Sequence, residues 1–505
     1  MNVANVLYQS ASFYREKPLL YFRDEPLAFA EFEAMVRKAQ GILRNAHVNP
    51  GDRVAILAAN KPEWLACYFA IMAIGAVVLP INPALTAPEA AYIIDDGKPA
   101  LAFVDLDLAP IIGNTSHRPK IVTLPSSDKR LSDWTGFDGA LPVELVVHDV
   151  DAEHPSIIYY TSGTTGRPKG AVIPHRSTLS TMTGTADWLR LTSDDKAVIT
   201  GSFAFILHST FAANSHILVG ATIILRDRFH PKDALEAVEL YRATVLMWVP
   251  AMYIMASEWA ETHATDLSSL RVCLSGGAPL PWAVEERFYR LSGRHILSGW
   301  GMSEGTPITG FDPAERGRPE SVGKALAGCR VKVLNDAGDE LPDREVGELV
   351  YLSPRNMTGY LNRPDDTAET LRSGWIYSGD LGWRDEEGYF YVVGRKKDMI
   401  IRGGSKIYPA EVEEVVTSSD DVAESAVVGA PDDRLGERVI AFVIPREGKA
   451  PDIAELKLLC EHKLAPYKIP QEFVVVDSFP RGPTGKILKR VLRDRLGAAA
   501  ESKRA

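Results

Sequence analysis

The chain of 505 residues contains few cysteines, at positions 67, 273, 329 and 460. They lie far apart and form no C-x-x-C pair, so neither a zinc site nor a disulfide framework is expected. A reducing compartment fits this pattern, and we expect a cytoplasmic protein.

The sequence also lacks an excess of positive charge and a long membrane-spanning run. Acidic residues (66) outnumber basic ones (56), and the net charge of −10 argues against a general nucleic-acid binder. The N-terminus has no basic segment followed by an apolar one, so no signal peptide is predicted. The longest apolar stretch, residues 64–80, is rich in Ala and Gly. We interpret it as a buried helix that leads into a strand, not as an integral membrane segment. A monomer and a homodimer both remain open.

Predicted strands and amphipathic helices alternate along most of the first 320 residues. This alternation predicts an α/β fold with a mainly parallel, doubly wound sheet. Asn60 is a candidate N-cap for a helix over 60–74, and a further helix is predicted over 211–219. Short β segments follow between about 320 and 394, and a charged joint spans 395–398. We therefore expect an N-terminal domain (1–394) with a small β-rich subdomain, then a hinge and a mobile α+β domain (399–505).

One glycine-rich segment, YTSGTTGRPKG at residues 160–170, lies between two predicted strands. Glycines allow a tight turn whose N–H groups point inward, while hydroxyls and Lys169 add donors and charge. This combination suits a polyphosphate, although the spacing is not that of the GxxxxGK[ST] loop. A polar hairpin turn is the alternative. An acidic, His-bearing segment at 148–154 lacks the spacing of a metal site and is read as a solvated connection.

A second motif, Gly301-Met-Ser-Glu-Gly305, matches the G-x-S-x-G elbow of serine hydrolases, with Ser303 as the nucleophile. The elbow requires a helix after the serine, and the prolines in 306–313 argue against one. A triad would also need a later histidine, and only His462 follows. A hydrolase is therefore a remote alternative.

Five motifs in order indicate a known family: YTSGTTGRPKG, GWGMSEG, YSGDLG, GYFYVVGRKKDMIIRGG and PTGK. Over about residues 10–495 the chain resembles the adenylate-forming superfamily, which includes acyl-CoA synthetases, luciferase and adenylation domains. The resemblance implies a ligase that uses ATP and Mg²⁺. A carboxylate attacks the α-phosphate of ATP to give acyl-AMP and pyrophosphate, and the thiol of CoA then takes the acyl group.

The resemblance assigns roles to the motif residues. Glu304 matches the magnesium-binding glutamate, with Thr161 nearby, because a hard cation prefers carboxylate oxygen. Trp300 stands where a tyrosine usually stacks on adenine, and Ser303 replaces a threonine. The phosphate loop is assigned Thr161, Ser162, Gly163, Thr164, Thr165, Gly166 and Lys169. The nucleotide slot is assigned Gly276, Gly277, Ala278, Trp300, Gly301, Met302 and Ser303.

The remaining matches lie towards the C-terminus. Asp380 and Arg395 match residues that contact the ribose or phosphate, and a surface ion pair is their alternative. Lys486 matches the catalytic lysine that bridges the carboxylate and the α-phosphate, where negative charge builds up. Its alternative is the start of a basic helix. Lys397 matches the hinge residue about which the C-terminal domain rotates, and the Gly403-Gly404 turn then lines a tunnel for CoA.

The acid pocket is predicted from apolar and small residues, with core packing as the alternative for some of them. The position that holds an aspartate in amino-acid-activating relatives corresponds to Ala204, which argues against an α-amino acid. We expect a medium- or long-chain fatty acid, or an aromatic acid. No carrier domain follows residue 496, so free CoA is expected, with a separate carrier protein as the alternative acceptor. The predicted pocket residues are Phe205, Trp248, Met252, Gly299 and Pro307.

Overall fold

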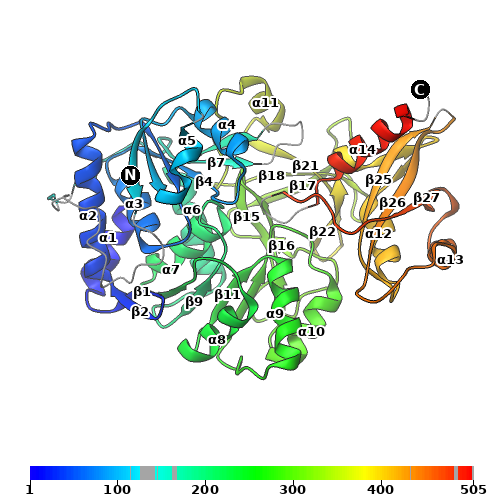
Figure 1. Cartoon of the computed structure of the whole chain (residues 1–505), viewed down its shortest axis with the longest axis horizontal. Coiled ribbons are helices and arrows are strands. Elements are labelled where there is room, and N and C mark those ends of the chain that lie inside the picture. The colour runs from blue at the N-terminus through cyan, green and yellow to red at the C-terminus, as the bar shows by residue number, and fades with distance from the viewer. Residues whose placement is uncertain are drawn as a thin grey trace. The chain divides into compact units, whose positions relative to one another are not determined.

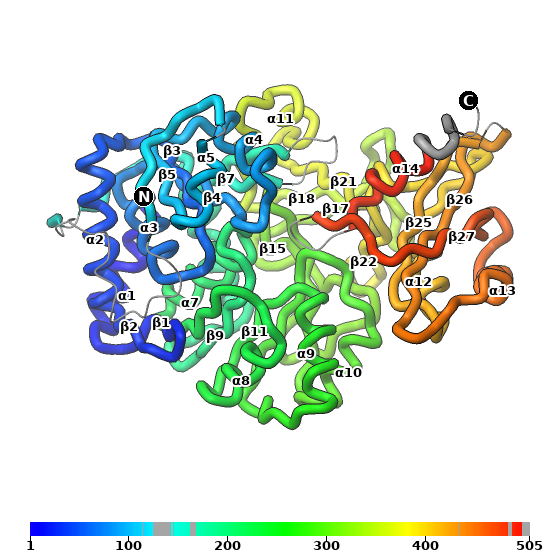
Figure 2. Tube along the Cα trace, in the orientation of Figure 1, coloured from blue at the N-terminus to red at the C-terminus, as the bar shows by residue number. Residues whose placement is uncertain are grey.

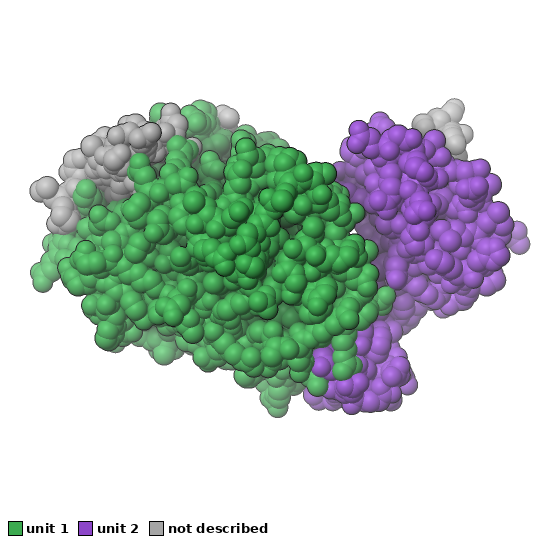
Figure 3. Space-filling view, turned by 90° about the horizontal axis from the view of Figure 1, so that it is seen from below, with its two compact units in different colours: residues 1–331, 351–377 green, residues 332–350, 378–505 purple. Residues whose placement is uncertain are grey.

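Figure 1 shows a computed structural model of the chain. It describes residues 1–113, 115–124, 143–144, 146–161, 168–432, 434–482 and 487–502. The chain forms two compact units (Figure 3): unit 1 comprises residues 1–331 and 351–377, and unit 2 comprises residues 332–350 and 378–505. In the part of the chain that the structure describes, no helix is long and apolar enough to cross a membrane.

The first sheet of unit 1 has seven strands in the order β19-β8-β7-β4-β3-β5-β6. The strands from β7 to β6 are parallel, whereas β8 is antiparallel to both of its neighbours. The strands are β3 (Arg53–Leu57), β4 (Val77–Ile81), β5 (Leu101–Asp105), β6 (Lys120–Leu124), β7 (Pro155–Thr161), β8 (Lys169–Pro174) and β19 (Gly359–Tyr360).

Helix α3 (Pro62–Ala73) is buried at every residue and leads into β4. A helix that is apolar on all sides belongs in the interior, because no face of it favours water. The interpretation of residues 64–80 as a buried helix and strand is therefore confirmed. Two further helices connect strands of the same sheet, α4 (Ala87–Gly97) and α5 (Ala109–Ile112).

The second sheet of unit 1 also has seven strands, in the order β13-β12-β11-β9-β10-β1-β2, and the chain can be followed through it in Figure 2. All neighbouring strands are parallel except β1 and β2. The strands are β1 (Pro18–Phe22), β2 (Glu25–Ala28), β9 (Lys196–Ile199), β10 (Thr222–Leu225), β11 (Val245–Trp248), β12 (Val272–Ser275) and β13 (Ile296–Ser298).

Helices α8, α9 and α10 pack on this second sheet around a core that contains Trp248, Tyr253 and Phe288. The mainly parallel α/β architecture predicted for the large domain is confirmed. The remaining helices of unit 1 are α1 (Asn5–Phe13), α2 (Phe29–Asn45), α6 (His175–Trp188), α7 (Asn214–Leu218), α8 (Pro231–Tyr241), α9 (Pro250–Thr262), α10 (Trp282–Ser292) and α11 (Pro364–Thr370).

Two local predictions differ from the structure. Asn60 does not cap α3: its side-chain amide donates to the Gly201 carbonyl (2.8 Å) and accepts from the Phe203 N–H (2.9 Å). The helix predicted over 211–219 begins earlier, as a π-helix over Leu207–Ala213 that runs into α7. The hydroxyl of Tyr159 bonds two residues of this π-helix, Ser209 and Thr210. Asn60 and the π-helix both form hydrogen bonds with residues that are distant in the sequence, which local patterns do not reveal.

Two smaller sheets accompany the two large sheets of unit 1. A three-stranded sheet contains β14 (Trp300–Met302), β15 (Gly305–Gly310) and β16 (Lys324–Ala325). Three strands of the next sheet, β17, β18 and β21, each pass from one unit into the other. The strands of that sheet are β17 (Arg330–Leu334), β18 (Gly347–Leu352), β20 (Leu371–Arg372), β21 (Trp375–Arg384) and β22 (Phe390–Arg395).

The C-terminal part of unit 2 is an α+β structure around one sheet, with apolar side chains packed against both of its faces. The strands follow the order β24-β23-β26-β25, and β27 pairs with β26. Its elements are β23 (Ile400–Arg402), β24 (Ser405–Ile407), α12 (Pro409–Thr417), β25 (Val422–Asp432), β26 (Gly436–Pro445), α13 (Ile453–Lys463), β27 (Glu472–Val475) and α14 (Lys489–Ser502).

Candidate active site

The glycine-rich loop connects two antiparallel strands, as predicted. Thr161 ends β7 and lies opposite Lys169, which begins β8. A Cβ at Gly170 would lie 2.8 Å from a methyl of Ile158, so only glycine fits at the base of this hairpin. The loop itself, with Ser162, Gly163, Thr164, Thr165 and Gly166, lies outside the described residues.

Lys169 has two partners that the sequence did not reveal. Its ammonium group forms an ion pair with Asp366 of α11 and lies 5.4 Å from the ring centroid of Tyr360. The Lys169 side chain is only 14% exposed, and that of Asp366 is 28% exposed. The cation is thus held in a partly buried place beside the base of the loop, where an anion is needed to balance it.

Glu304 is almost fully buried, and its carboxylate accepts a hydrogen bond of 2.6 Å from the Tyr360 hydroxyl. Burial and the nearby Glu304 carboxylate raise the pKa of Tyr360 well above its usual value, so the phenol remains a donor. Among the described residues no cluster of three or more acidic, His or Cys side chains could hold a metal alone. Mg²⁺ usually takes one or two protein carboxylates together with phosphate and water oxygens. The single carboxylate of Glu304 fits that pattern.

Ser303 lies in the turn between β14 and β15, so a strand precedes it and another strand follows it. A nucleophile elbow needs a helix at the second place. The prediction that 306–313 is not helical is therefore confirmed, and the local geometry does not match that of a serine hydrolase. The turn between these strands instead places Glu304 next to Ser303.

The predicted nucleotide residues follow the carboxyl ends of two neighbouring parallel strands. Ser275 of β12 lies opposite Ser298 of β13, and the Gly299 N–H donates to the Ser275 carbonyl (3.0 Å). A Cβ at Gly276 would lie 3.8 Å from the Gly299 carbonyl oxygen, so these two backbone segments run close together. Gly277, at φ +85°, precedes Ala278. Ligands of open α/β sheets bind at this edge.

The segment after Gly299 also packs closely. Trp300 is 8% exposed, and its ring meets that of Tyr351 edge to face at 5.6 Å. A Cβ at Gly301 would lie 2.5 Å from the Thr306 hydroxyl, so the facing strand requires glycine there, and Met302 follows it. Stacking of Trp300 on adenine stays a prediction.

The predicted acid-pocket residues have different surroundings. Trp248 is fully buried in the core of the second sheet and donates to the Val198 carbonyl (3.3 Å), as the core-packing alternative expects. Phe205 precedes the π-helix, and its carbonyl accepts from the Ser209 hydroxyl. Met252 contacts the Thr200 hydroxyl through its sulfur (3.8 Å). The Pro307 carbonyl accepts from the buried Arg355. A shared pocket for these residues stays a prediction.

In unit 2, Asp380 and Arg395 lie opposite each other on β21 and β22. The Arg395 Nε is 2.5 Å from Asp380 Oδ1, and the Asp380 side chain is only 7% exposed. The structure therefore brings the two residues together, as an ion pair less exposed than the surface alternative implies. The carboxylate is held in place beside a cation at the start of the joint.

The predicted hinge and tunnel residues lie close to this pair along the chain. Lys397 is in a short 3₁₀ turn, and burial lowers the pKa of its ammonium group. Gly403 (φ +56°) and Gly404 (φ +84°) form the turn between β23 and β24. A Cβ at Gly404 would meet no described atom within 4 Å, so the turn faces open space. Lys486 lies outside the described residues.

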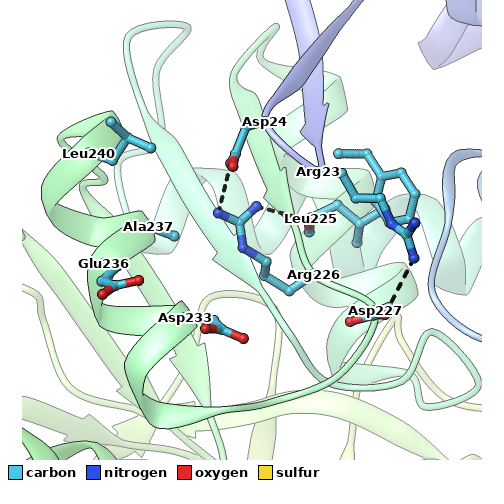
Figure 4. Close-up of a pocket in the computed structure, with 10 residues that line it drawn as sticks. Arg23, Asp24, Leu225, Arg226, Asp227, Asp233, Glu236, Ala237 and Leu240 are labelled. Atoms are coloured by element: carbon cyan, nitrogen blue, oxygen red, sulfur yellow. Dashed lines mark hydrogen bonds and ion pairs between the residues drawn. The ribbon is translucent and has the colours of Figure 1, made fainter. Parts of the chain in front are cut away.

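A surface pocket of about 300 Å³ lies elsewhere in unit 1, between the β1–β2 turn and α8 (Figure 4). It is lined by charged residues that largely pair with one another: Arg226 with Asp24 at 3.1 Å and Arg23 with Asp227 at 4.0 Å. None of the predicted site residues lines this pocket. It is not the site that the sequence motifs indicate.

Comparison with known proteins identifies the class. The AMP-binding enzyme family matches residues 7–361, and the AMP-binding enzyme C-terminal domain matches residues 411–486. The chain belongs to the AMP-binding enzyme family, and the resemblance noted from its motifs is confirmed.

The particular relatives include a long-chain-fatty-acid–CoA ligase of Bacillus subtilis (strain 168), which is 31% identical and is matched over 97% of this chain and 93% of its own. Feruloyl-CoA synthase of Amycolatopsis sp is 36% identical over 93% and 94% of the two chains. Among solved structures, ATP-bound MatB from Rhodopseudomonas palustris has a TM-score of 0.90 at 30% identity, over 98% of this chain and 99% of that one.

Proposed function

We propose that the protein is an acyl-CoA synthetase, a carboxylate–CoA ligase that forms AMP. It activates a hydrophobic carboxylic acid with ATP to give acyl-AMP and pyrophosphate, and then transfers the acyl group to CoA. The observation that carries this proposal is the convergence of Glu304 and Lys169 on Tyr360, beside the strands of the phosphate-type loop. The similarity to a long-chain-fatty-acid–CoA ligase and to a feruloyl-CoA synthase also supports the proposal.

In the first step an oxygen of the substrate carboxylate attacks the α-phosphorus, and the bond to the pyrophosphate oxygen breaks. Lys169 and the loop N–H groups neutralise the leaving pyrophosphate. Lys486 stabilises the charge that develops at the α-phosphate. Glu304, with Thr161 nearby, would hold Mg²⁺, which supplies further charge neutralisation at the phosphate oxygens.

The nucleoside is held by groups that need little rearrangement. The backbone at Gly276, Gly277 and Ala278 offers one wall of an adenine slot, because glycine and alanine permit close approach. Trp300 supplies the opposite wall. Asp380, which Arg395 already orients, accepts from the ribose hydroxyls.

In the second step the CoA sulfur attacks the acyl carbonyl and AMP leaves. We infer an N-terminal domain of residues 1–394 with a β-rich subdomain at about 320–394, and a C-terminal domain of residues 399–505. The C-terminal domain rotates relative to the N-terminal domain about a hinge at 395–398, centred on Lys397. The open space at Gly404 supports a tunnel for the pantetheine arm.

The acid is a medium- or long-chain fatty acid, or an aromatic acid, since the residues assigned to its pocket are apolar or small. The named substrates of the two relatives cover both classes. A separate carrier protein is the alternative acceptor. We also infer that the enzyme acts in the cytoplasm, as a monomer or a homodimer.

The proposal is tested by AMP release from ATP across a panel of fatty, aryl and dicarboxylic acids, with and without CoA. The expected result is acid-dependent pyrophosphate release and CoA-dependent accumulation of AMP and thioester for fatty or aryl acids. Pyrophosphate release that proceeds without any added CoA, followed by acyl transfer only to a carrier protein, would favour the alternative acceptor. No acid-dependent AMP release for any acid would refute the proposal.

A further inference from the structure

Tyr360 contacts both side chains to which a polyphosphate and its metal are assigned. Its hydroxyl donates to the Glu304 carboxylate at 2.6 Å, and the Lys169 ammonium lies 5.4 Å from its ring centroid. Tyr360 is 56 residues from Glu304 in the sequence, and no motif pointed to it. One aromatic side chain thus connects an anion from the β14–β15 turn and a cation from the start of β8.

The backbone around Tyr360 ties together the same two segments. The Met357 N–H donates to the Glu304 carbonyl (2.8 Å), and the Leu361 N–H donates to the Gly170 carbonyl (2.8 Å). Tyr360 itself lies opposite Ala171 in β8, and its N–H donates to the Thr367 hydroxyl (2.8 Å). These bonds leave the phenol little freedom, so its position defines the positions of the two groups that it touches.

The chemistry of the contact explains why a phenol suits this place. A buried carboxylate needs hydrogen-bond donors, and a donor at a fixed place also holds the carboxylate in one orientation. A neutral hydroxyl supplies the donor without adding a charge that would compete with a metal ion. The ring also offers Lys169 a favourable face. The lysine pairs with Asp366, while the Glu304 carboxylate accepts from the Tyr360 hydroxyl.

We propose that Tyr360 is a positioning residue for the adenylation step. Its hydroxyl holds the Glu304 carboxylate in one orientation for the metal, while its ring separates Glu304 from Lys169 so that each remains available to MgATP. This inference rests on the proposed function and names Tyr360 as a residue that acts through Glu304.

The test is the variant Tyr360→Phe, which removes one oxygen and retains the ring. ATP binding is measured by calorimetry in EDTA and in Mn²⁺, and the ratio of the two Kd values gives the metal-dependent gain. We expect this gain to fall about tenfold, as expected for a lost hydrogen bond to a charged group. The Kd in EDTA should change less than twofold, which also shows that the variant is folded.

Tyr92→Phe is the matched control, because it removes the same atom beside the same loop. The Tyr92 hydroxyl donates to the Pro168 carbonyl (3.1 Å) and accepts from Arg363. The metal-dependent gain of Tyr92→Phe should match that of the wild type. A loss equal to that of Tyr360→Phe would show that the loop, and not Glu304, is the affected group, and would overturn the inference.

A double-mutant cycle with Glu304→Gln completes the test. If Tyr360 acts through Glu304, Tyr360→Phe should alter the metal-dependent gain less than twofold in the Glu304→Gln background. The same loss in both backgrounds would overturn the inference. Absence of ATP binding by the wild-type protein would refute the proposed function itself.

Discussion

Removal of the Asp366 charge should tighten the binding of ATP. Lys169 forms an ion pair with Asp366, and both side chains are largely but not fully buried. A polyphosphate bound at the loop must either compete with Asp366 for the Lys169 ammonium group or bind beside the negative charge of Asp366. In either case Asp366 opposes binding. The variant Asp366→Asn keeps the shape of the side chain and removes its charge.

The expected size follows from the surroundings of the pair. Two unit charges about 4 Å apart interact by about 4 kcal/mol at the effective dielectric constant of a protein surface. Measured values for exposed pairs are nearer 0–1 kcal/mol because of screening and side-chain entropy. With exposures of 14% and 28% the pair is intermediate, and we take about 1 kcal/mol as the cost to ATP. This corresponds to a Kd about fivefold lower for Asp366→Asn.

Calorimetric titration with ATP in EDTA measures this change without a contribution from metal. Asp365→Asn is the matched control, since Asp365 is the preceding residue in the first turn of α11, is exposed, and makes no ion pair with Lys169. Its Kd should stay within twofold of the wild type. In a Lys169→Ala background most of the gain from Asp366→Asn should disappear. Weaker ATP binding by Asp366→Asn would refute the reasoning, because Asp366 would then hold Lys169 in its binding position.

Four further outcomes are expected. Gly404→Leu should leave acid-dependent pyrophosphate release within about twofold of wild type while thioester formation falls by at least tenfold, since the leucine would enter the open space assigned to the pantetheine arm and would strain only a local turn at φ +84°; intact CoA ligation in a coupled assay would contradict the tunnel. Lys486→Ala should lose adenylation but still convert preformed acyl-adenylate to thioester, and equal loss of both half-reactions would refute its role. Burial raises the pKa of the Glu63 carboxyl to about 7, so its contribution to stability is fully present below about pH 4.5 and is lost as pH rises through 7. The free energy of unfolding should therefore decline by at most about 3 kcal/mol over this range. Thermal unfolding of Glu63→Gln should not show the decline. Ser303 should not react with a fluorophosphonate, and stoichiometric labelling seen by mass spectrometry would contradict the strand–turn–strand geometry.

Helices and strands could be predicted from the sequence where their ends are determined by residues that are adjacent in the chain. Helix α8 begins at Pro231 and ends at Tyr241, because proline favours the first helical turn and the apolar residues repeat at helical spacing. The strands on either side of the glycine-rich loop were predicted for a similar reason. Among the described site residues, Asp380 and Arg395 were both named from their motifs and lie together.

Long-range contacts could not be predicted in this way. Asp366 is 197 residues from Lys169, and Tyr360 is on a two-residue strand, so neither forms a local pattern around a motif. Asn60 was assigned to a helix cap because Asn commonly caps helices, but its amide bonds a loop more than 140 residues away. Trp248 is buried in the core of the second sheet and also stays a predicted pocket residue, because an apolar residue type alone does not distinguish a pocket wall from a core.

Helix α3 makes the two large sheets of unit 1 depend on each other for stability. It leads into a strand of the first sheet, yet its Trp64 ring lies 5.2 Å from Phe203 and its Tyr68 hydroxyl accepts from Asn214, both in the chain segment of the second sheet. If either sheet opened alone, a helix with no polar face would meet water. We therefore expect the two sheets to unfold in one cooperative transition, with similar hydrogen-exchange protection in β4 and β11. A fragment that contains only one of the sheets should aggregate instead of folding.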